Sequence, residues 1–264
     1  MNDCDRLKLF EDLSRIFQII YYKPLWRKYD LNDPINAASL FLEGYAFERQ
    51  GRSPAFSPAA VEAINRSRKE KDSVNFPLIV WNNFRDLLNG EGLNRKLNPL
   101  YPKYPQYHLE KSCGCIWCTF NSENIINSSK QALETGKTKD AWERLKKIQG
   151  VGPKIASLFL RDVATWYDLA LPKDDNRWYL QPIDIWVRRI VINLNKKYMN
   201  DEEVARWIVI NSDKPEQCNQ GIWYFGAKIA QAEFRLESCL KDPEKTIEQH
   251  IIALKANAQA IFQL

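Results

Sequence analysis

Apolar residues recur along most of this chain at intervals of three and four positions, the spacing that places them on one face of an α-helix. The first run covers residues 6–29, where Leu9, Leu13 and Ile16 share a face and Pro24 interrupts the helix. The same pattern predicts helices in the later segments 35–50, 57–68, 76–89, 121–138, 138–148, 155–163, 183–194, 201–211, 221–234 and 246–262. These predictions together indicate an all-α protein.

Prolines mark where some of these helices should begin. Pro34 precedes the segment 35–50, and Ser57 followed by Pro58 suits an N-cap and a first helical residue. By contrast, the segment 97–110 is rich in proline and tyrosine and has no usable period. We therefore predict a long connection there.

A tight hairpin between two predicted helices is the most informative local pattern. Gly150, Val151 and Gly152 form the bend, and Pro153 suits the first turn of the helix that follows. The N-terminus of such a helix presents backbone N–H groups that can bind an anion such as a DNA phosphate. We therefore expect Gly150, Val151 and Gly152 to contact the DNA backbone.

A second pattern covers residues 181–189, which read QPIDIWVRR. A proline opens this segment, and apolar residues at helical spacing, including Ile183, Val187 and Ile190, predict the buried face of a helix. Asp184 lies near the start of that helix. By itself it would be interpreted as a capping carboxylate that pairs with Arg188 four residues on.

Lys154, directly after the hairpin, is a candidate nucleophile. A nucleophilic lysine must lose its proton near neutral pH, although the pKa of a free ammonium is about 10.4. Lys154 falls at about the second residue of its predicted helix, where the positive end of the helix dipole disfavours a cation. Burial against the apolar helix would act in the same direction. The alternative is a lysine that only contacts a DNA phosphate.

These two patterns resemble the helix-hairpin-helix DNA glycosylase superfamily, in its lysine-bearing bifunctional type, similar to endonuclease III and the 8-oxoguanine glycosylases. There the hairpin ends in Gly-x-Gly-x-Lys, and a downstream aspartate stands in an (Ile/Val)-Asp-x-x-Val-Arg-Arg context. The matching residues here are Gly150, Gly152, Lys154 and Asp184, and the resemblance covers roughly residues 140–197. It implies that Lys154 is the amine nucleophile and Asp184 the catalytic carboxylate.

The resemblance also implies two helical lobes with a lesion-binding cleft between them. We expect one lobe to span residues 35–165 and to end in the helix-hairpin-helix motif at residues 140–165. The second lobe would combine residues 1–34 with residues 166–264.

The implied activity is base-excision repair by a DNA glycosylase with an associated AP lyase activity. The enzyme would remove an oxidised base, with 8-oxoguanine slightly favoured, through a Schiff base on Lys154. Its substrate would be double-stranded DNA that contains a damaged base, and we expect a monomer. Two alternatives stay open: a helix-hairpin-helix protein that binds DNA without turnover, and an enzyme that cleaves only at abasic sites.

The apolar run 221–234 is similar to the late helix of the 8-oxoguanine branch, which lines the base pocket. This similarity implies base-pocket roles for Trp223 and Phe225, and packing in the core is the alternative. The glycines of this run do not form a phosphate-binding loop, because the Lys-Ser/Thr pair that such a loop requires is absent.

Composition and charge agree with these expectations without requiring them. A net charge of +5 and a pI near 8.8 permit nucleic-acid binding. No apolar run approaches the ~18 residues of a membrane helix, and the N-terminus lacks the layout of a signal peptide. We therefore expect no membrane partner, and a location in the cytoplasm, at a prokaryotic nucleoid, or in a nucleus.

Cys113, Cys115 and Cys118 form a dense cysteine cluster with His108 five residues upstream. A zinc or iron–sulfur site would need a fourth ligand, and buried thiols are the alternative interpretation. Some members of the glycosylase superfamily hold an iron–sulfur cluster on four closely spaced cysteines after the aspartate, whereas only two cysteines follow Asp184 here. We therefore assign no metal and no cofactor.

Overall fold

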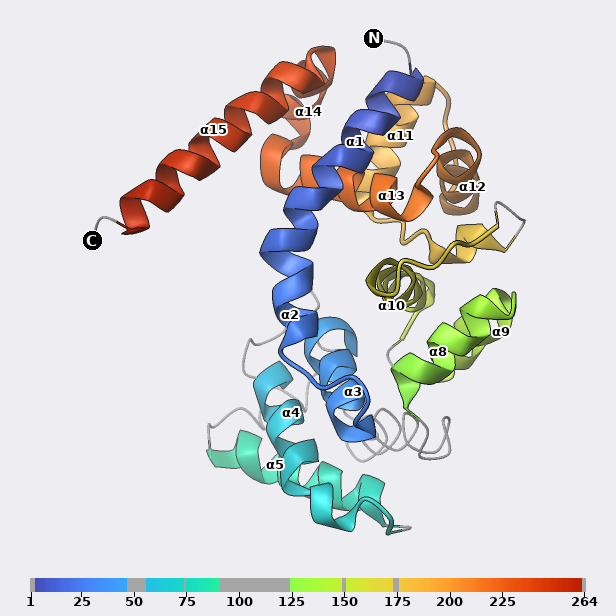
Figure 1. The fold of residues 1–264 in the computed structure, drawn as a ribbon, viewed down its shortest axis with the longest axis vertical. Coiled ribbons are helices and arrows are strands. Elements are labelled where there is room, and N and C mark those ends of the chain that lie inside the picture. Colours follow the sequence, from blue (N-terminus) through green and yellow to red (C-terminus); the bar gives the residue numbers. More distant parts are fainter. Residues whose placement is uncertain are drawn as a thin grey trace. The chain divides into compact units, whose positions relative to one another are not determined.

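The computed structural model describes residues 3–46, 56–73, 75–90, 124–148, 151–172 and 176–262 (Figure 1). Regular structure in these ranges consists of α-helices with short π- and 3₁₀-helical segments, and none of these ranges contains a strand. The predicted all-α class is therefore confirmed. Among the described helices, none is both long enough and apolar enough to cross a membrane.

The described helices group into two compact units. Unit 1 combines residues 1–22 with residues 172–264, and unit 2 consists of residues 23–171. The boundaries predicted from the sequence fall after residues 34 and 165, whereas the contacts of the structure divide the chain after residues 22 and 171. The cleft expected between two lobes stays a prediction.

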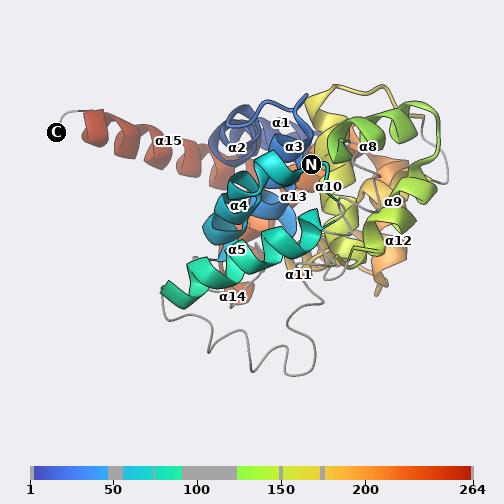
Figure 2. The ribbon, with the colours of Figure 1, turned by 90° about the horizontal axis from the view of Figure 1, so that it is seen from below.

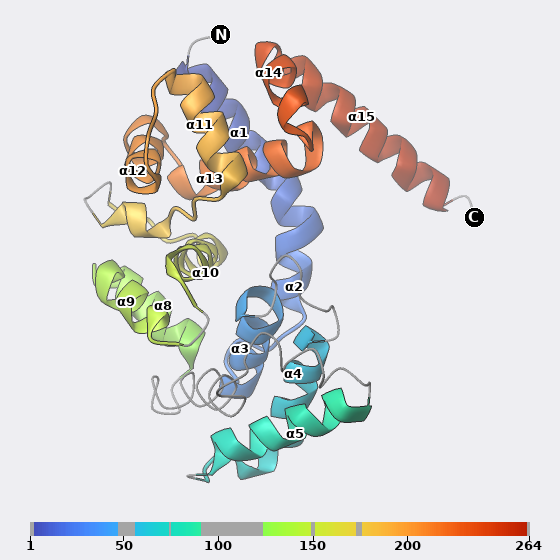
Figure 3. The ribbon, with the colours of Figure 1, turned by 180° about the vertical axis from the view of Figure 1, so that it is seen from behind.

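Unit 1 is built from both ends of the chain. Its helical segments are α1 (Asp3–Phe17), η1 (Gln18–Tyr22), η4 (Arg177–Leu180), α11 (Ile185–Asn195), α12 (Asp201–Asn211), α13 (Pro215–Tyr224), η5 (Phe225–Ala230), α14 (Glu233–Lys241) and α15 (Pro243–Phe262). α1 packs along α13, and α11 packs against α12 and α13 (Figure 3). In the core between α1 and η5, Phe10 and Phe225 meet edge to face with ring centroids 5.4 Å apart.

Gly221 lets α13 approach the backbone of α1. A Cβ atom at this position would lie 1.8 Å from the carbonyl oxygen of Phe10, far inside van der Waals contact. Gly226 has the same role against α11, since its Cβ atom would lie 2.7 Å from the Cβ atom of Trp186. The glycines of the run 221–234 therefore serve close helix packing.

Unit 2 holds the hairpin. Its helical segments are α2 (Lys23–Arg27), α3 (Pro34–Phe41), η2 (Leu42–Ala46), α4 (Phe56–Arg66), η3 (Arg68–Glu70), α5 (Phe76–Gly90), α8 (Ile125–Glu134), α9 (Thr138–Lys146) and α10 (Pro153–Trp166). α8, α9 and α10 lie against one another, and α4 packs on α5 (Figures 1 and 2). Asp33 and Asn124 start α3 and α8, because their side-chain oxygens accept from the first free backbone N–H groups.

Three predicted helix limits are wrong in detail. Pro24 is the second residue of α2, so the break in the first helix falls in the π-helical η1 before it. Ser57 lies inside α4, and its hydroxyl donates to the carbonyl oxygen of Glu43 at 3.1 Å instead of capping the helix. The predicted helix 221–234 is broken at Gln231, whose left-handed φ of 60° separates η5 from α14.

Gly221→Ala should destabilise the protein, although replacement of glycine by alanine within a helix normally stabilises by about 1 kcal/mol. The new methyl group has to displace the backbone of α1, and such overpacking costs about 1–3 kcal/mol. A lower midpoint of urea unfolding, followed by circular dichroism, measures the loss. Gly90→Ala is the matched control, because its Cβ atom would meet no atom of the described residues within 4 Å. Equal midpoints for the two variants would contradict the packing role of Gly221.

Candidate functional site

The N-terminus of α10 carries the hairpin motif. Gly152 is the N-cap residue in extended conformation, with φ −90° and ψ 180°, and Pro153 and Lys154 are the first two helical residues. Gly152 has no side chain to cap the helix, and Pro153 has no N–H group. The N–H groups of Gly152, Lys154 and Ile155 therefore have no acceptor among the described residues. Such an end can bind an anion.

The predicted DNA contacts of the bend are not equivalent. A Cβ atom on Gly152 would meet no atom of the described residues within 4 Å, so these residues leave the space beside this backbone open to another molecule. Val151 differs, because its side chain is buried and its N–H group already donates to the carbonyl oxygen of Ile148 at 3.0 Å. Val151 thus has no N–H group left for a phosphate, and Gly150 lies outside the described residues.

Polar contacts fix α10 on two of its sides. On one side, the indole N–H of Trp142 in α9 donates to the hydroxyl of Ser157 at 2.9 Å. On the other, the hydroxyl of Tyr45 in η2 donates to Asp162 at 3.0 Å. Arg161 and Asp162 form a buried ion pair with an N–O distance of 2.8 Å. The helix that the sequence presents as mainly apolar therefore buries two opposite charges.

Lys154 is exposed, so its amine is not buried against the apolar side of the helix. The buried residues of α10 begin at Ala156, so its first turn remains in solvent. The expected position at the second residue of the helix is confirmed.

Asp184 is the N-cap residue of α11. Its Oδ1 atom accepts from the backbone N–H groups of Trp186 and Val187, both at 2.9 Å. The Oδ2 atom has no hydrogen-bond partner among the described residues. The carboxylate is thus held in one orientation through one oxygen, while its second oxygen can accept from another molecule.

The arginines after Asp184 pair with other carboxylates. Arg188 contacts Asp201 at the start of α12, with 2.6 Å between its Nε atom and Oδ1, so the expected pair with Asp184 is not formed. Arg189 pairs with Glu233 of α14 at 2.8 Å. Both arginines therefore tie α11 to its neighbours, which leaves the carboxylate of Asp184 without a cationic partner from its own helix.

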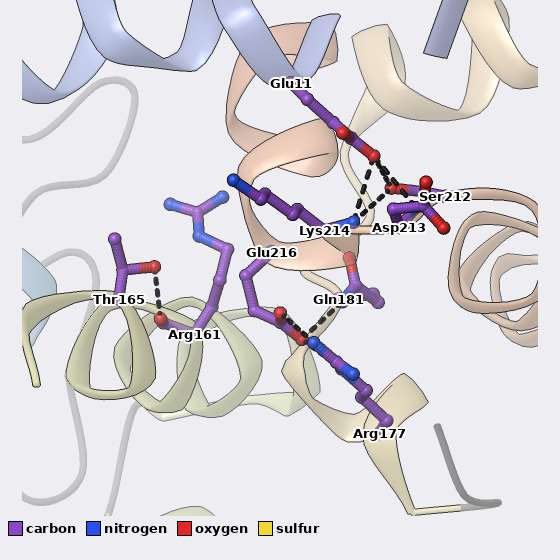
Figure 4. A network of polar contacts seen from close by, with 9 residues as sticks. All are labelled: Glu11, Arg161, Thr165, Arg177, Gln181, Ser212, Asp213, Lys214 and Glu216. Carbon is purple, nitrogen blue, oxygen red and sulfur yellow. Dashed lines mark hydrogen bonds and ion pairs between the residues drawn. The ribbon is translucent and has the colours of Figure 1, made fainter. Parts of the chain in front are cut away.

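The segment before Asp184 is held by side chains that lie far from their partners in the sequence. Arg177 and Glu216 form a buried bidentate pair with N–O distances of 3.0 and 2.8 Å (Figure 4). Gln181 also donates to Glu216, at 3.4 Å, and Asn219 donates to the carbonyl oxygen of Pro182 at 3.2 Å. These contacts fix residues 177–182 on α13. No local pattern identifies them, because the partners lie far apart in the sequence.

A further contact in unit 1 joins α1 to the turn before α13. The Oε1 atom of Glu11 in α1 accepts from the backbone N–H groups of Asp213 and Lys214, at 2.9 and 3.0 Å, and from the hydroxyl of Ser212 (Figure 4). This carboxylate therefore supplies acceptors at the turn before α13.

The two residues proposed for a base pocket have different environments. Phe225 is fully buried, with 0% of its surface exposed, and so offers no face on which a base could stack. For Phe225, the packing role considered as the alternative is the one observed. Trp223 is half-buried and lies edge to face against Phe17, with ring centroids 5.6 Å apart.

The cysteine cluster at residues 113–118, like His108 and the connection predicted at 97–110, lies outside the described residues. Among the residues that the structure describes, no group of three or more histidine, cysteine or acidic side chains could hold a metal ion. Cys218 and Cys239 are both buried thiols, and burial raises the pKa of Cys218.

Lys154 belongs to unit 2 and Asp184 to unit 1. Within unit 2, Gly152 and Lys154 are brought together at the first turn of α10. Within unit 1, Asp184 and the contacts that hold its segment are brought together at the start of α11. The two halves of the expected active site are thus each ordered inside their own unit.

Comparison with known proteins gives one distant relative. No family model matches this chain, and no solved structure matches it. An uncharacterized protein of Methanocaldococcus jannaschii, MJECL21, is 27% identical over a region that covers 73% of this chain and 49% of the relative. The chain therefore spans about half the length of that protein. The comparison assigns no activity, and membership of the glycosylase superfamily stays a prediction.

Tyr224 and His250 link the end of α13 to α15, with 2.9 Å between the phenol oxygen and Nε2. Burial lowers the pKa of His250 below its usual 6.5. Burial, with a smaller contribution from Tyr21, raises the pKa of Tyr224 to about 12. At neutral pH the imidazole is therefore neutral, and its nitrogen can accept the phenol hydrogen.

His250 should make the free energy of unfolding depend on pH below about 6.5. Because its pKa is lower in the folded state, the unfolded chain binds the proton first as the pH falls, and the protein loses stability. His250→Gln should flatten this dependence in urea midpoints measured at a series of pH values. Tyr224→Phe, which keeps the imidazole, should preserve the slope. An unaltered slope in His250→Gln would contradict the assignment.

Proposed function

We propose that this protein is a DNA glycosylase with an AP lyase activity that removes an oxidised base from double-stranded DNA. The proposal rests on two helix N-termini, those of α10 and α11, which carry different polar groups. They occur in one chain and in the same order as in the superfamily that the chain resembles. One offers N–H groups that have no acceptor among the described residues, beside a lysine, and the other offers a fixed carboxylate.

The start of α10 supports a role in holding DNA and in attacking the sugar. The N–H groups of Gly152, Lys154 and Ile155, which have no acceptor in the described part of the chain, provide donors for a backbone phosphate. Because Lys154 is exposed at the same turn, its amine can reach a group bound beside these donors. A phosphate held there would place the adjoining sugar within range of the amine.

The start of α11 supports a role for Asp184 in the same reaction. A carboxylate that is oriented by two backbone N–H groups needs little reorganisation when it acts on a substrate. Its free Oδ2 atom can take a proton from an amine or face positive charge that develops on a sugar.

The proposed reaction begins when the target nucleotide leaves the base stack. The amine of Lys154 attacks C1′ of the sugar, and the base departs with the electrons of the glycosidic bond. Asp184 assists loss of the proton from the attacking amine and offsets the charge on the sugar. Opening of the sugar gives a Schiff base on Lys154, and β-elimination then breaks the strand on the 3′ side.

The exposure of Lys154 favours one alternative from another class. An exposed lysine beside free N–H groups also suits a protein that binds a phosphate and performs no chemistry. Incubation with duplexes that carry 8-oxoguanine, thymine glycol, uracil or an abasic site separates these functions. Binding without release of any base supports the DNA-binding protein, and cleavage confined to abasic DNA supports a lyase alone.

Lys154→Ala should abolish covalent trapping of the protein on DNA by borohydride, because only a Schiff base is reduced to a stable adduct. Wild-type protein should form this adduct with lesion-containing or abasic duplexes, as seen by a shifted band in denaturing electrophoresis. Lys147→Ala is the matched control, since Lys147 is also exposed and lies at the end of α9 in the same hairpin. Retention of the adduct in Lys154→Ala would remove this residue from its proposed role.

Asp184→Asn should slow base release by about 10²–10⁴-fold while leaving the free energy of unfolding nearly unchanged. Asparagine caps a helix about as well as aspartate, so its amide oxygen can keep the contacts with Trp186 and Val187. Single-turnover excision and urea unfolding measure the two effects. Asp184→Ala is a poorer test, because it also removes the cap. Full activity in Asp184→Asn would contradict a catalytic carboxylate.

A further inference from the structure

Two π-helical segments from opposite ends of the chain meet in unit 1. η1 (Gln18–Tyr22) follows α1, and η5 (Phe225–Ala230) follows α13, the helix against which α1 packs. Phe17 lies edge to face with Trp223, and the rings of Tyr21 and Tyr224 are 6.1 Å apart. π-Helical turns are rare and occur often at functional sites, so this junction is a candidate for binding.

An aromatic–lysine patch, formed by Tyr21, Trp223 and Lys228, lies at this junction. The Lys228 amine is 4.9 Å from the ring centroid of Tyr21 and 6.0 Å from that of Trp223. Tyr21 is 41% exposed, and Trp223 and Lys228 are each half-buried. The patch thus presents two aromatic rings and a positive charge to solvent.

Apart from the contacts between the amine and the two rings, the polar groups of the patch have no hydrogen-bond or ion-pair partner in the described part of the chain. Arg189 and Arg206 in the same unit are paired with carboxylates, but no carboxylate lies within ion-pair distance of Lys228 among the described residues. The described residues also provide no hydrogen-bond partner for the hydroxyl of Tyr21 or the indole N–H of Trp223. An amine, a phenol and an indole are therefore available together as donors.

We propose that the aromatic–lysine patch binds an unpaired nucleotide of DNA, with the base against the aromatic rings and the phosphate on Lys228. Aromatic side chains stack on any base, and lysine neutralises the backbone charge beside it. A purely apolar ligand would leave the amine without a counter-charge, and a bare anion would not use the rings. A nucleotide satisfies both groups at once.

This patch shares Trp223 with the base pocket expected from the sequence, but Tyr21 and Lys228 take the place of the buried Phe225. It does not require the amine chemistry of Lys154, which belongs to unit 2. The unpaired nucleotide has two possible sources, a single strand or a nucleotide displaced from a duplex, and the experiment treats them separately.

Binding of a short fluorescein-labelled oligothymidylate, followed by fluorescence anisotropy, tests the patch. Tyr21→Ala should weaken binding roughly fivefold or more, the effect of losing one stacked base. Lys228→Gln should weaken binding and lower the slope of log affinity against log salt by about 0.7, because one phosphate contact is lost. Tyr21→Phe and Lys228→Arg should bind almost as wild type, which separates loss of contact from loss of fold.

Tyr198→Ala and Lys241→Gln are the matched controls. Tyr198 is 83% exposed, and Lys241 is an exposed lysine at the end of α14. Both lie in unit 1 but outside the patch, and both variants should bind as wild type. If the patch variants bind as tightly as the wild type, or no more weakly than these controls, the proposal is overturned.

Duplex DNA distinguishes the source of the nucleotide and keeps this proposal separate from the enzymatic one. If the patch receives a displaced nucleotide, Tyr21→Ala should also weaken binding to a lesion duplex; an effect limited to the oligothymidylate identifies a single-strand contact. Borohydride trapping of the wild-type protein on an abasic duplex tests the proposed lyase independently of the patch. Absence of trapping in the wild type would contradict the proposed lyase and leave the binding result intact.

Discussion

Unit 1 depends on the close approach of α1 to α13. At Gly221 there is room only for the hydrogen atom of glycine, because a methyl group would overlap the carbonyl oxygen of Phe10. α1 begins the chain and α13 lies near its end, so this contact closes a unit whose two segments are separated by residues 23–171. Glu11 adds to the closure by accepting from the turn before α13. A unit assembled from distant segments has to make such contacts specific, because chain connectivity does not hold its parts together.

The position of α10 in unit 2 depends on polar groups placed inside an otherwise apolar interior. The Arg161–Asp162 pair carries a desolvation cost, which is offset when the charges meet and further hydrogen bonds are made. Tyr45 provides one of these bonds and itself accepts from the indole N–H of Trp26 at 2.9 Å. Directional contacts of this kind fix how a helix is rotated about its axis, which apolar packing alone specifies less sharply. The rotation of α10 determines where Lys154 points.

Asp184 shows how one carboxylate can be structural and remain available for chemistry. Capping uses Oδ1 alone, and the neighbouring arginines are occupied by Asp201 and Glu233. The backbone, rather than a cation, therefore holds the carboxylate in place. The network around Glu216 holds the preceding segment and so limits where this helix start can move.

Local sequence determined the helical class and many of the helices, because a repeat of three to four residues needs no knowledge of the fold. α12 matches its predicted range of 201–211, and Pro153 begins α10 as expected. The sequence also placed Lys154 at the second position of its helix. These features depend on neighbours within a few residues, and such neighbours are visible in the chain itself.

Tertiary structure alone decided the exposure of Lys154, the burial of Phe225 and the partner of Arg188. Each depends on which distant segment packs against the residue, and a periodic pattern does not identify that segment. The same reason explains why the Arg177–Glu216 pair was missed, since its members stand 39 residues apart. The helical pattern is therefore a property of short segments, whereas the environment of each reactive side chain follows from the packing of segments that the chain brings together only on folding.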